Sequence, residues 1–139
     1  MEKYFLENDI KVICFTAKSF PDKVMEAHQF LHSRLENVNS RKFFGISHPG
    51  RSGTIIYKAA AEVLNEKETE IPGCETFIIK KGEYISKFIP RFCDDVTSIG
   101  KAFKELLTYP GIDPQGYCLE MYLSDTDVRC MVGIISEKS

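Results

Sequence analysis

The sequence has 139 residues, of which 43% are apolar and 27% are charged, so it has the size and composition of one globular domain rather than of a multidomain enzyme or a disordered chain. Eighteen Lys and Arg residues against 20 Asp and Glu residues give a net charge of −2, which argues against nucleic acid as a direct partner. Because no apolar run is long enough to cross a bilayer and the first residues lack the pattern of a signal peptide, we expect a cytoplasmic protein without membrane contact.

The first half of the chain has the hydrophobic pattern of a strand, a helix and two more strands. Residues 10–17 are rich in β-branched and aromatic side chains, which predicts a strand. Pro21 and Asp22 suit the start of a helix, and apolar residues then recur at helical spacing to about residue 36. Residues 41–47 and 54–60 predict two strands, joined by a turn rich in Gly and Pro.

The same order of elements is predicted again after a charged connector at residues 65–70. Residues 75–80 predict a strand, Lys81 and Gly82 a turn, and residues 84–89 an extended continuation. A helix follows, with an apolar stripe at Val96, Ile99, Phe103, Leu106 and Leu107. Residues 117–123 and 128–135 predict a hairpin. The chain is therefore read as β-α-β-β twice, with halves at residues 10–64 and 71–136 of a single domain. The fold class is α+β, with one antiparallel sheet, both helices on one face and the other face open.

The last hairpin contains the strongest candidate functional residue, Glu120. A loop centred on Asp125 and Thr126 pairs Tyr122 with Arg129 and Glu120 with Met131. In this register Glu120 points away from the helices, onto the open face of the sheet. A carboxylate in such a place requires a cation or hydrogen-bond donors if it is buried.

Two interpretations of Glu120 remain open from the residues alone. Arg129 or Lys58 can supply an ordinary surface ion pair, which is common for a glutamate in mid-strand. Alternatively, Glu120 is the negative anchor of a pocket for a cationic or polar organic ligand. The pocket would then have Tyr57, Tyr122 and Phe77 as aromatic walls and Met131 as adaptable lining, although such side chains more often pack in a core.

Several segments resemble GyrI-like small-molecule-binding domains, which also serve as effector-binding domains of AraC-type and multidrug-sensing transcription regulators. The segments similar to the second half of that family are Ile-Pro-Gly at 71–73, Lys-Gly-Glu-Tyr-Ile at 81–85, residues 99–107, Ile-Asp-Pro at 112–114 and residues 118–123. Residues 43–49 and 56–60 are similar to the matching hairpin of the first half. The resemblance covers most of residues 10–135.

This resemblance implies a duplicated β-α-β-β fold that receives amphipathic, often cationic, small organic ligands against an acidic residue, matched here by Glu120. Only residues 1–9 precede the first predicted strand, which is too short for a helix-turn-helix domain. We therefore expect a stand-alone sensor or sequestering protein, with any link to transcription regulation made through a separate protein.

Two other functions stay open. Some relatives of the family resemble hydrolases of small electrophilic compounds, with the same glutamate as catalyst, so Glu120 could act as a general base. A protein-protein inhibitor or adaptor is the third class, and it requires an exposed apolar patch.

Weaker motifs are set aside, and neither a metal nor a cofactor is expected. Residues 45–52 nearly match the phosphate-loop motif, but a predicted strand rather than a helix follows them. His28 and His32 have the spacing of metal ligands on a helix without an acidic or cysteine partner nearby. The five cysteines are scattered, which favours free thiols in a reducing compartment.

Overall fold

The computed structural model describes residues 1–95 and 97–135. The segments with strand-like and helix-like hydrophobic patterns form strands and helices in it. Val96, predicted in the stripe of the second helix, lies outside the described residues. The chain forms two compact units, Asp9–Ile79 (unit 2) and Met1–Asn8 with Lys80–Ser139 (unit 1). The α+β class is confirmed, since each unit contains antiparallel strands and one α-helix.

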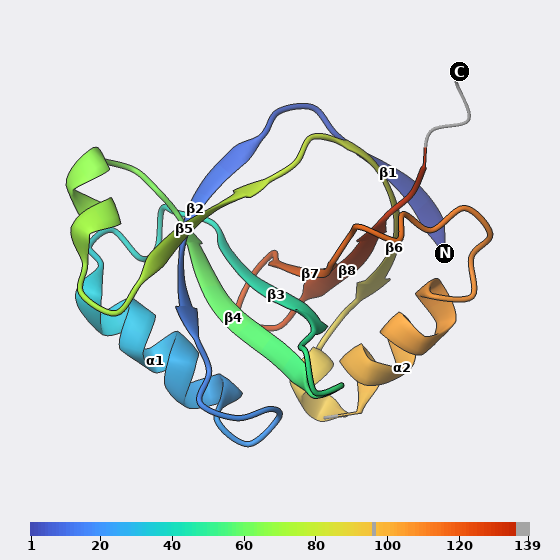
Figure 1. The fold of residues 1–139 in the computed structure, drawn as a ribbon, viewed down its shortest axis with the longest axis horizontal. Coiled ribbons are helices and arrows are strands. Elements are labelled where there is room, and N and C mark those ends of the chain that lie inside the picture. Colours follow the sequence, from blue (N-terminus) through green and yellow to red (C-terminus); the bar gives the residue numbers. More distant parts are fainter. Residues whose placement is uncertain (96, 136–139) are drawn as a thin grey trace. The chain divides into compact units, whose positions relative to one another are not determined.

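Unit 2 contains four antiparallel strands in the order β3-β4-β2-β5, together with one α-helix and the 3-10 helix η1 (Figure 1). Their bounds are β2 Ile10–Thr16, α1 Val24–Arg34, β3 Phe43–Pro49, β4 Ile55–Glu62, η1 Glu66–Glu70 and β5 Glu75–Ile79. Gly50 and Gly53 lie in the turn between β3 and β4, where the Gly50 amide donates to the Thr54 carbonyl at 2.6 Å. The near match to a phosphate loop is thus a hairpin turn.

Helix α1 buries the apolar stripe that the sequence predicts. Ala27, Leu31 and Leu35 are buried, and they pack against Ile13 and Ala59 on one face of the sheet. The small alanines of β4 let the helix approach the strands closely. This contact forms the core of unit 2 on that face.

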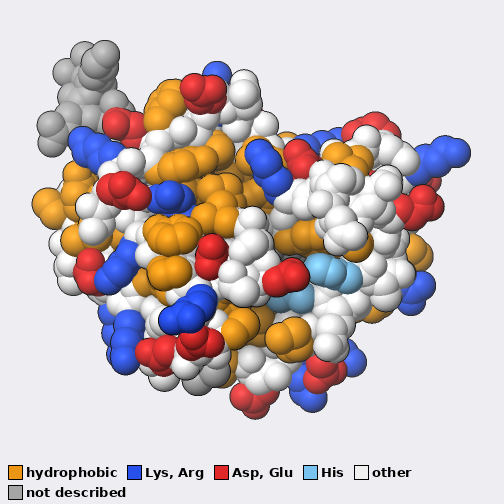
Figure 2. All heavy atoms as spheres, turned by 180° about the vertical axis from the view of Figure 1, so that it is seen from behind, with side chains coloured by type: hydrophobic (Ala, Val, Ile, Leu, Met, Phe, Trp, Pro, Cys, Tyr) orange, Lys and Arg blue, Asp and Glu red, His pale blue; other side chains and the backbone are white. Residues whose placement is uncertain are grey.

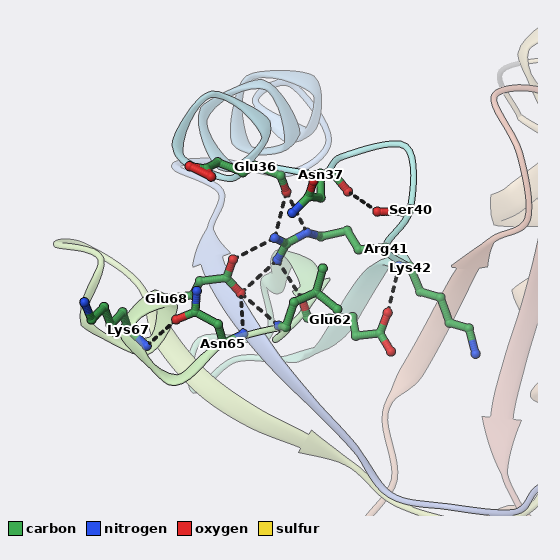
Figure 3. Close-up of polar contacts among 10 residues, drawn as sticks. Glu36, Asn37, Ser40, Arg41, Lys42, Glu62, Asn65, Lys67 and Glu68 are labelled. Atoms are coloured by element: carbon green, nitrogen blue, oxygen red, sulfur yellow. Dashed lines mark hydrogen bonds and ion pairs between the residues drawn. The ribbon is translucent and has the colours of Figure 1, made fainter.

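A buried arginine joins the segment after α1 to the end of β4 and to η1 (Figure 3). Arg41 donates to the backbone carbonyls of Glu36 and Glu62, and its two terminal nitrogens contact the Glu68 carboxylate at 3.0 and 2.6 Å. Glu68 also accepts from the backbone amides of Leu64 and Asn65. The Arg41 side chain is fully buried, and a buried guanidinium requires an opposite charge. The bidentate contact with the Glu68 carboxylate supplies it.

Unit 1 contains the other four antiparallel strands, in the order β1-β6-β8-β7, with one α-helix and the 3-10 helix η2. Their bounds are β1 Glu2–Leu6, β6 Gly82–Ile89, η2 Phe92–Asp94, α2 Ser98–Leu106, β7 Cys118–Tyr122 and β8 Val128–Gly133. Helix α2 packs Ala102 and Leu106 on the sheet face that carries Val128, Cys130 and Val132.

The N-terminal strand β1 was not expected from the sequence. It pairs with β6, so that Glu2 lies opposite Ser86 and Leu6 opposite Gly82. Arg129 of β8 holds this edge strand, since its Nη1 contacts Glu2 at 2.9 Å and its guanidinium lies 5.2 Å from the Tyr4 ring centroid. Unit 2 gains its own edge strand in the same way, because β5 pairs with β2.

The prediction of an open sheet face is wrong in both units. Leu119 and Met131 point away from the α2 side in unit 1, yet both have 0% exposure. In unit 2, Val12 and Phe44 on the face opposite α1 are also fully buried. Strands that are apolar on both faces have both faces buried.

The exposed surface carries charges of both signs. Figure 2 shows Lys and Arg side chains interspersed with Asp and Glu side chains on the face in view, as the net charge of −2 leads one to expect. Among the described residues, no helix is both long and apolar enough to span a bilayer.

All five cysteines are free thiols, as predicted, although only Cys14 and Cys130 are buried. Burial raises the pKa of each of these two thiols to about 12. A thiol with so high a pKa is almost entirely protonated at neutral pH and is a poor nucleophile.

The Arg41–Glu68 pair predicts acid sensitivity. The hydrogen bond from Arg41 lowers the pKa of the Glu68 carboxyl from 4.5 to about 2, so its contribution is complete above pH 4.5 and is lost as the pH falls toward 2. We expect Glu68→Gln to lower the free energy of unfolding by about 3 kcal/mol at pH 7. Urea unfolding at pH 7, 4 and 2.5 should show this difference shrinking with acid. Glu66→Gln, in the same 3-10 helix, is the matched control with little effect, and an equal loss in both variants would contradict the assignment.

Candidate functional site

Glu120 lies in the middle of β7, in unit 1, where it is only 7% exposed. Its cross-strand partner on β8 is Cys130, which belongs to the apolar cluster that α2 covers. A carboxylate in this position has lost most of its hydration and depends on hydrogen bonds or opposite charge within the protein.

The predicted register of this hairpin is wrong by one residue. Tyr122 lies opposite Val128 rather than Arg129, Glu120 opposite Cys130 rather than Met131, and Cys118 opposite Val132 rather than Gly133. The physical reason is the turn. The turn is centred on Asp125. The Ser124 hydroxyl accepts hydrogen bonds from the backbone amides of Thr126 and Asp127, and the Leu123 amide donates to the Asp127 carbonyl.

This one-residue difference changes which face of the sheet holds the carboxylate. Glu120 shares its face with Val128, Cys130 and Val132, the residues that meet α2. The prediction that Glu120 points away from the helix is therefore wrong. The face that combines Arg129 and Met131 is the opposite one, because adjacent residues of a strand point to opposite sides.

Tyr122 holds the Glu120 side chain in place. Its hydroxyl donates a short hydrogen bond to Oε1 of Glu120, two residues earlier on the same strand. The Tyr122 ring in turn lies 5.6 Å from the ring centroid of Phe92 in η2 and packs against the α2 cluster. The carboxylate thus has a hydrogen-bond donor, whose aromatic ring packs against a second ring, that of Phe92.

The cations proposed from the sequence as partners of Glu120 form ion pairs with other carboxylates. Arg129 contacts Glu2 at 2.9 Å, and Lys58 contacts Glu75 at 2.9 Å. Lys87 lies on the same sheet face as Glu120, on the far side of Cys130.

Lys87 forms its own ion pair with Glu105 of α2, with their charged atoms 2.9 Å apart. The electrostatic effect of Glu120 is visible at Cys130, where burial is the larger cause of the raised thiol pKa and the nearby Glu120 carboxylate adds to it. A negative charge close to a thiol disfavours the thiolate.

Tyr57 lies in unit 2, on the sheet face that α1 covers, and is 2% exposed. Its hydroxyl and Nε2 of His28 are 2.8 Å apart, and the ring of Phe20 stacks on it with the centroids 5.8 Å apart. Burial, with a smaller effect of His32, lowers the pKa of His28 from 6.5 to about 4. His28 is therefore neutral at physiological pH.

The remaining predicted pocket residues lie on other faces. Met131 is fully buried opposite Leu119, on the side of its sheet away from Glu120. Phe77 lies opposite Val12, on the side of its sheet away from Tyr57. Of the five candidates, only Glu120 and Tyr122 come together, in unit 1. Tyr57, Phe77 and Met131 each lie on a different sheet face from that pair or in the other unit.

The structure adds residues that sequence reasoning did not place in a site. Phe92 contacts the Tyr122 ring, Cys130 lies opposite Glu120, and His28 and Phe20 contact Tyr57. His28 was singled out only for its metal-ligand spacing, but His32 stacks on Phe43 at 4.1 Å. Within residues 1–95 and 97–135, no three His, Cys, Asp or Glu side chains come together in a metal-binding group.

Solved structures with the same fold span almost the whole chain. An integron cassette protein from the mobile metagenome of Vibrio cholerae gives a TM-score of 0.69 over 97% of this chain and 100% of its own, at 13% identity. SAV2435, solved bound to tetraphenylphosphonium, gives 0.62 over 98% and 95%, at 9% identity. A hydrolase from Listeria innocua gives 0.61 over 96% and 91%, at 12% identity. No protein-family model and no curated protein sequence matches the chain. At these identities the similarity establishes the fold alone.

The lowered pKa of His28 predicts how the stability of the fold changes with pH. The unfolded chain takes up a proton at this residue below about pH 6.5, whereas the folded chain does so only near pH 4. The residue therefore destabilises the fold as the pH falls through that window. We expect the His28 imidazole signals, assigned with His28→Gln, to report a neutral ring down to about pH 4 in an NMR titration. Titration near pH 6.5 in the folded protein would contradict its burial.

Proposed function

We propose that this protein binds small organic molecules and favours cations, with Glu120 as the charged anchor. The observation that carries the proposal is a carboxylate that is 7% exposed in mid-strand and receives a hydrogen bond from Tyr122. A desolvated carboxylate attracts a cation more strongly than an exposed one does, because water no longer screens the charge.

The surroundings of Glu120 suit an organic rather than an inorganic cation. Tyr122 provides an aromatic ring beside the carboxylate, and the Phe92 ring packs against that of Tyr122. Aromatic faces stabilise lipophilic cations through their quadrupoles. Across the residues that the structure describes, no three His, Cys, Asp or Glu side chains gather to supply the several ligands that a calcium or magnesium ion needs. A site that holds its ligand by one charge and apolar contacts can accept cations of different shapes.

The comparisons with known structures support the same proposal. SAV2435 was solved with tetraphenylphosphonium, a lipophilic organic cation, and its fold matches 98% of this chain. Together with the resemblance to GyrI-like domains, this leads us to propose a duplicated effector-binding fold. We propose a sensor or sequestering role in the cytoplasm, where free thiols stay reduced, and a link to transcription through a separate regulator.

The binding experiment uses tetraphenylphosphonium and its neutral analogue triphenylphosphine oxide. We expect the cation to raise the melting temperature of the wild type in a saturable manner, and isothermal titration should give an affinity reduced about tenfold or more in Glu120→Gln. Glu7→Gln, an exposed glutamate in the same unit, is the control. Equal affinities for the cation in all three proteins, or equal affinities for the cation and the oxide, would remove Glu120 from the proposed role.

A second candidate function is hydrolysis of a small electrophilic compound, with Glu120 activating water as a general base. Two observations favour it: a Listeria innocua hydrolase has the same fold, and Tyr122 orients the carboxylate through a hydrogen bond. We expect turnover of ester or epoxide substrates to fall by a hundredfold or more, roughly, in Glu120→Gln. Saturable binding without product across such a panel would favour the sensor role.

A further inference from the structure

A hollow of about 130 Å³ lies beside α1 in unit 2, and the residues assigned above to ligand binding do not line it. It has an apolar floor and a charged rim. The lining residues are Phe15, Ala17, Lys18, Lys23, Glu26, Ala27 and Phe30.

Two stacked aromatic rings form the floor of the hollow. The rings of Phe15 and Phe30 stack with their centroids 4.1 Å apart, and the Arg34 guanidinium lies 4.9 Å from the Phe30 centroid. Ala17 directly follows β2, and its amide donates to the Tyr57 carbonyl at 2.8 Å. Because Ala17 and Ala27 have small side chains, space remains beside the stacked rings that a larger residue would fill.

The rim has an excess of positive charge. Lys23 and Glu26 form an ion pair with their charged atoms 2.8 Å apart, which leaves the ammonium group of Lys18 as the surplus charge among the lining residues. Lys23 foremost, and Lys18 to a smaller extent, hold the pKa of the Glu26 carboxyl below its usual value. The positive end of the α1 dipole, which starts at Val24, acts in the same direction.

We propose that this hollow is a binding site for a small aromatic carboxylate with a single ring. A buried space of about 150 Å³ is known to accept one benzene ring, so a volume of about 130 Å³ suits one ring at an open surface. The ring contacts Phe15 and Phe30, and the carboxylate lies toward Lys18. The proposal is independent of the function assigned to Glu120, because it concerns an organic anion rather than a cation.

Benzoate titrated into the ¹⁵N-labelled full chain at constant ionic strength tests this site. We expect saturable shifts at the amides of Phe15, Ala17 and Phe30, with a dissociation constant on the order of 1 mM for so small a ligand. Benzylamine, which has the same ring and the opposite charge, should bind more weakly. Stronger binding of benzylamine, or shifts that rise linearly without saturation, would overturn the proposal.

Two variants separate the charge from the space. Lys18→Gln should weaken benzoate binding about fivefold without changing the melting temperature, whereas Lys67→Gln, an exposed lysine of the same unit, should leave the affinity unchanged. Ala17→Leu should fill the hollow and abolish the shifts while the rest of the spectrum is retained. An unchanged affinity in both Lys18→Gln and Ala17→Leu would refute the site.

Discussion

The central physical constraint in this molecule is the burial of one carboxylate in an apolar sheet face. Glu120 shares its face of β7 and β8 with Val128, Cys130 and Val132, which α2 covers. An ionised group at such a position costs free energy unless donors or a counter-charge compensate it. The Tyr122 hydroxyl supplies one donor. A carboxylate that is placed in this way has a strong electrostatic preference for positive ligands, and this preference connects the fold to the proposed function.

A second buried charge, in the part of the chain that the structure describes, belongs to Arg41. Arg41 has five hydrogen bonds, two to the Glu68 carboxylate and three to backbone carbonyls, and it fastens three segments of unit 2 together. Its partners are acceptors fixed by secondary structure, so the pair has a structural role. The buried charge of Arg41 therefore holds the fold, whereas we propose that the buried charge of Glu120 serves recognition.

The sequence alone was sufficient for the elements whose evidence is local. The α1 stripe of Ala27, Leu31 and Leu35 follows from helical periodicity, and the strands rich in β-branched residues were found with bounds close to those observed. Strand β1 was missed because it is short, and its pairing with β6 joins residues about eighty positions apart. The face of Glu120 was predicted wrongly because it depends on the Ser124 side chain, which centres the turn on Asp125. Likewise, only tertiary structure brings His28 to Tyr57 and Phe92 to Tyr122.

The pairing of β1 also affects how the termini can be altered. Residues 2–6 precede unit 2 in the chain, but they form the edge strand beside β6 in unit 1, the unit that contains Glu120. Arg129 holds them there through Glu2 and Tyr4. A purification tag or a fusion partner joined before residue 2 is thus attached to unit 1, although most of unit 1 follows unit 2 in the sequence. Trimming that end would expose the backbone of β6 as a new sheet edge, and an exposed edge invites intermolecular strand addition.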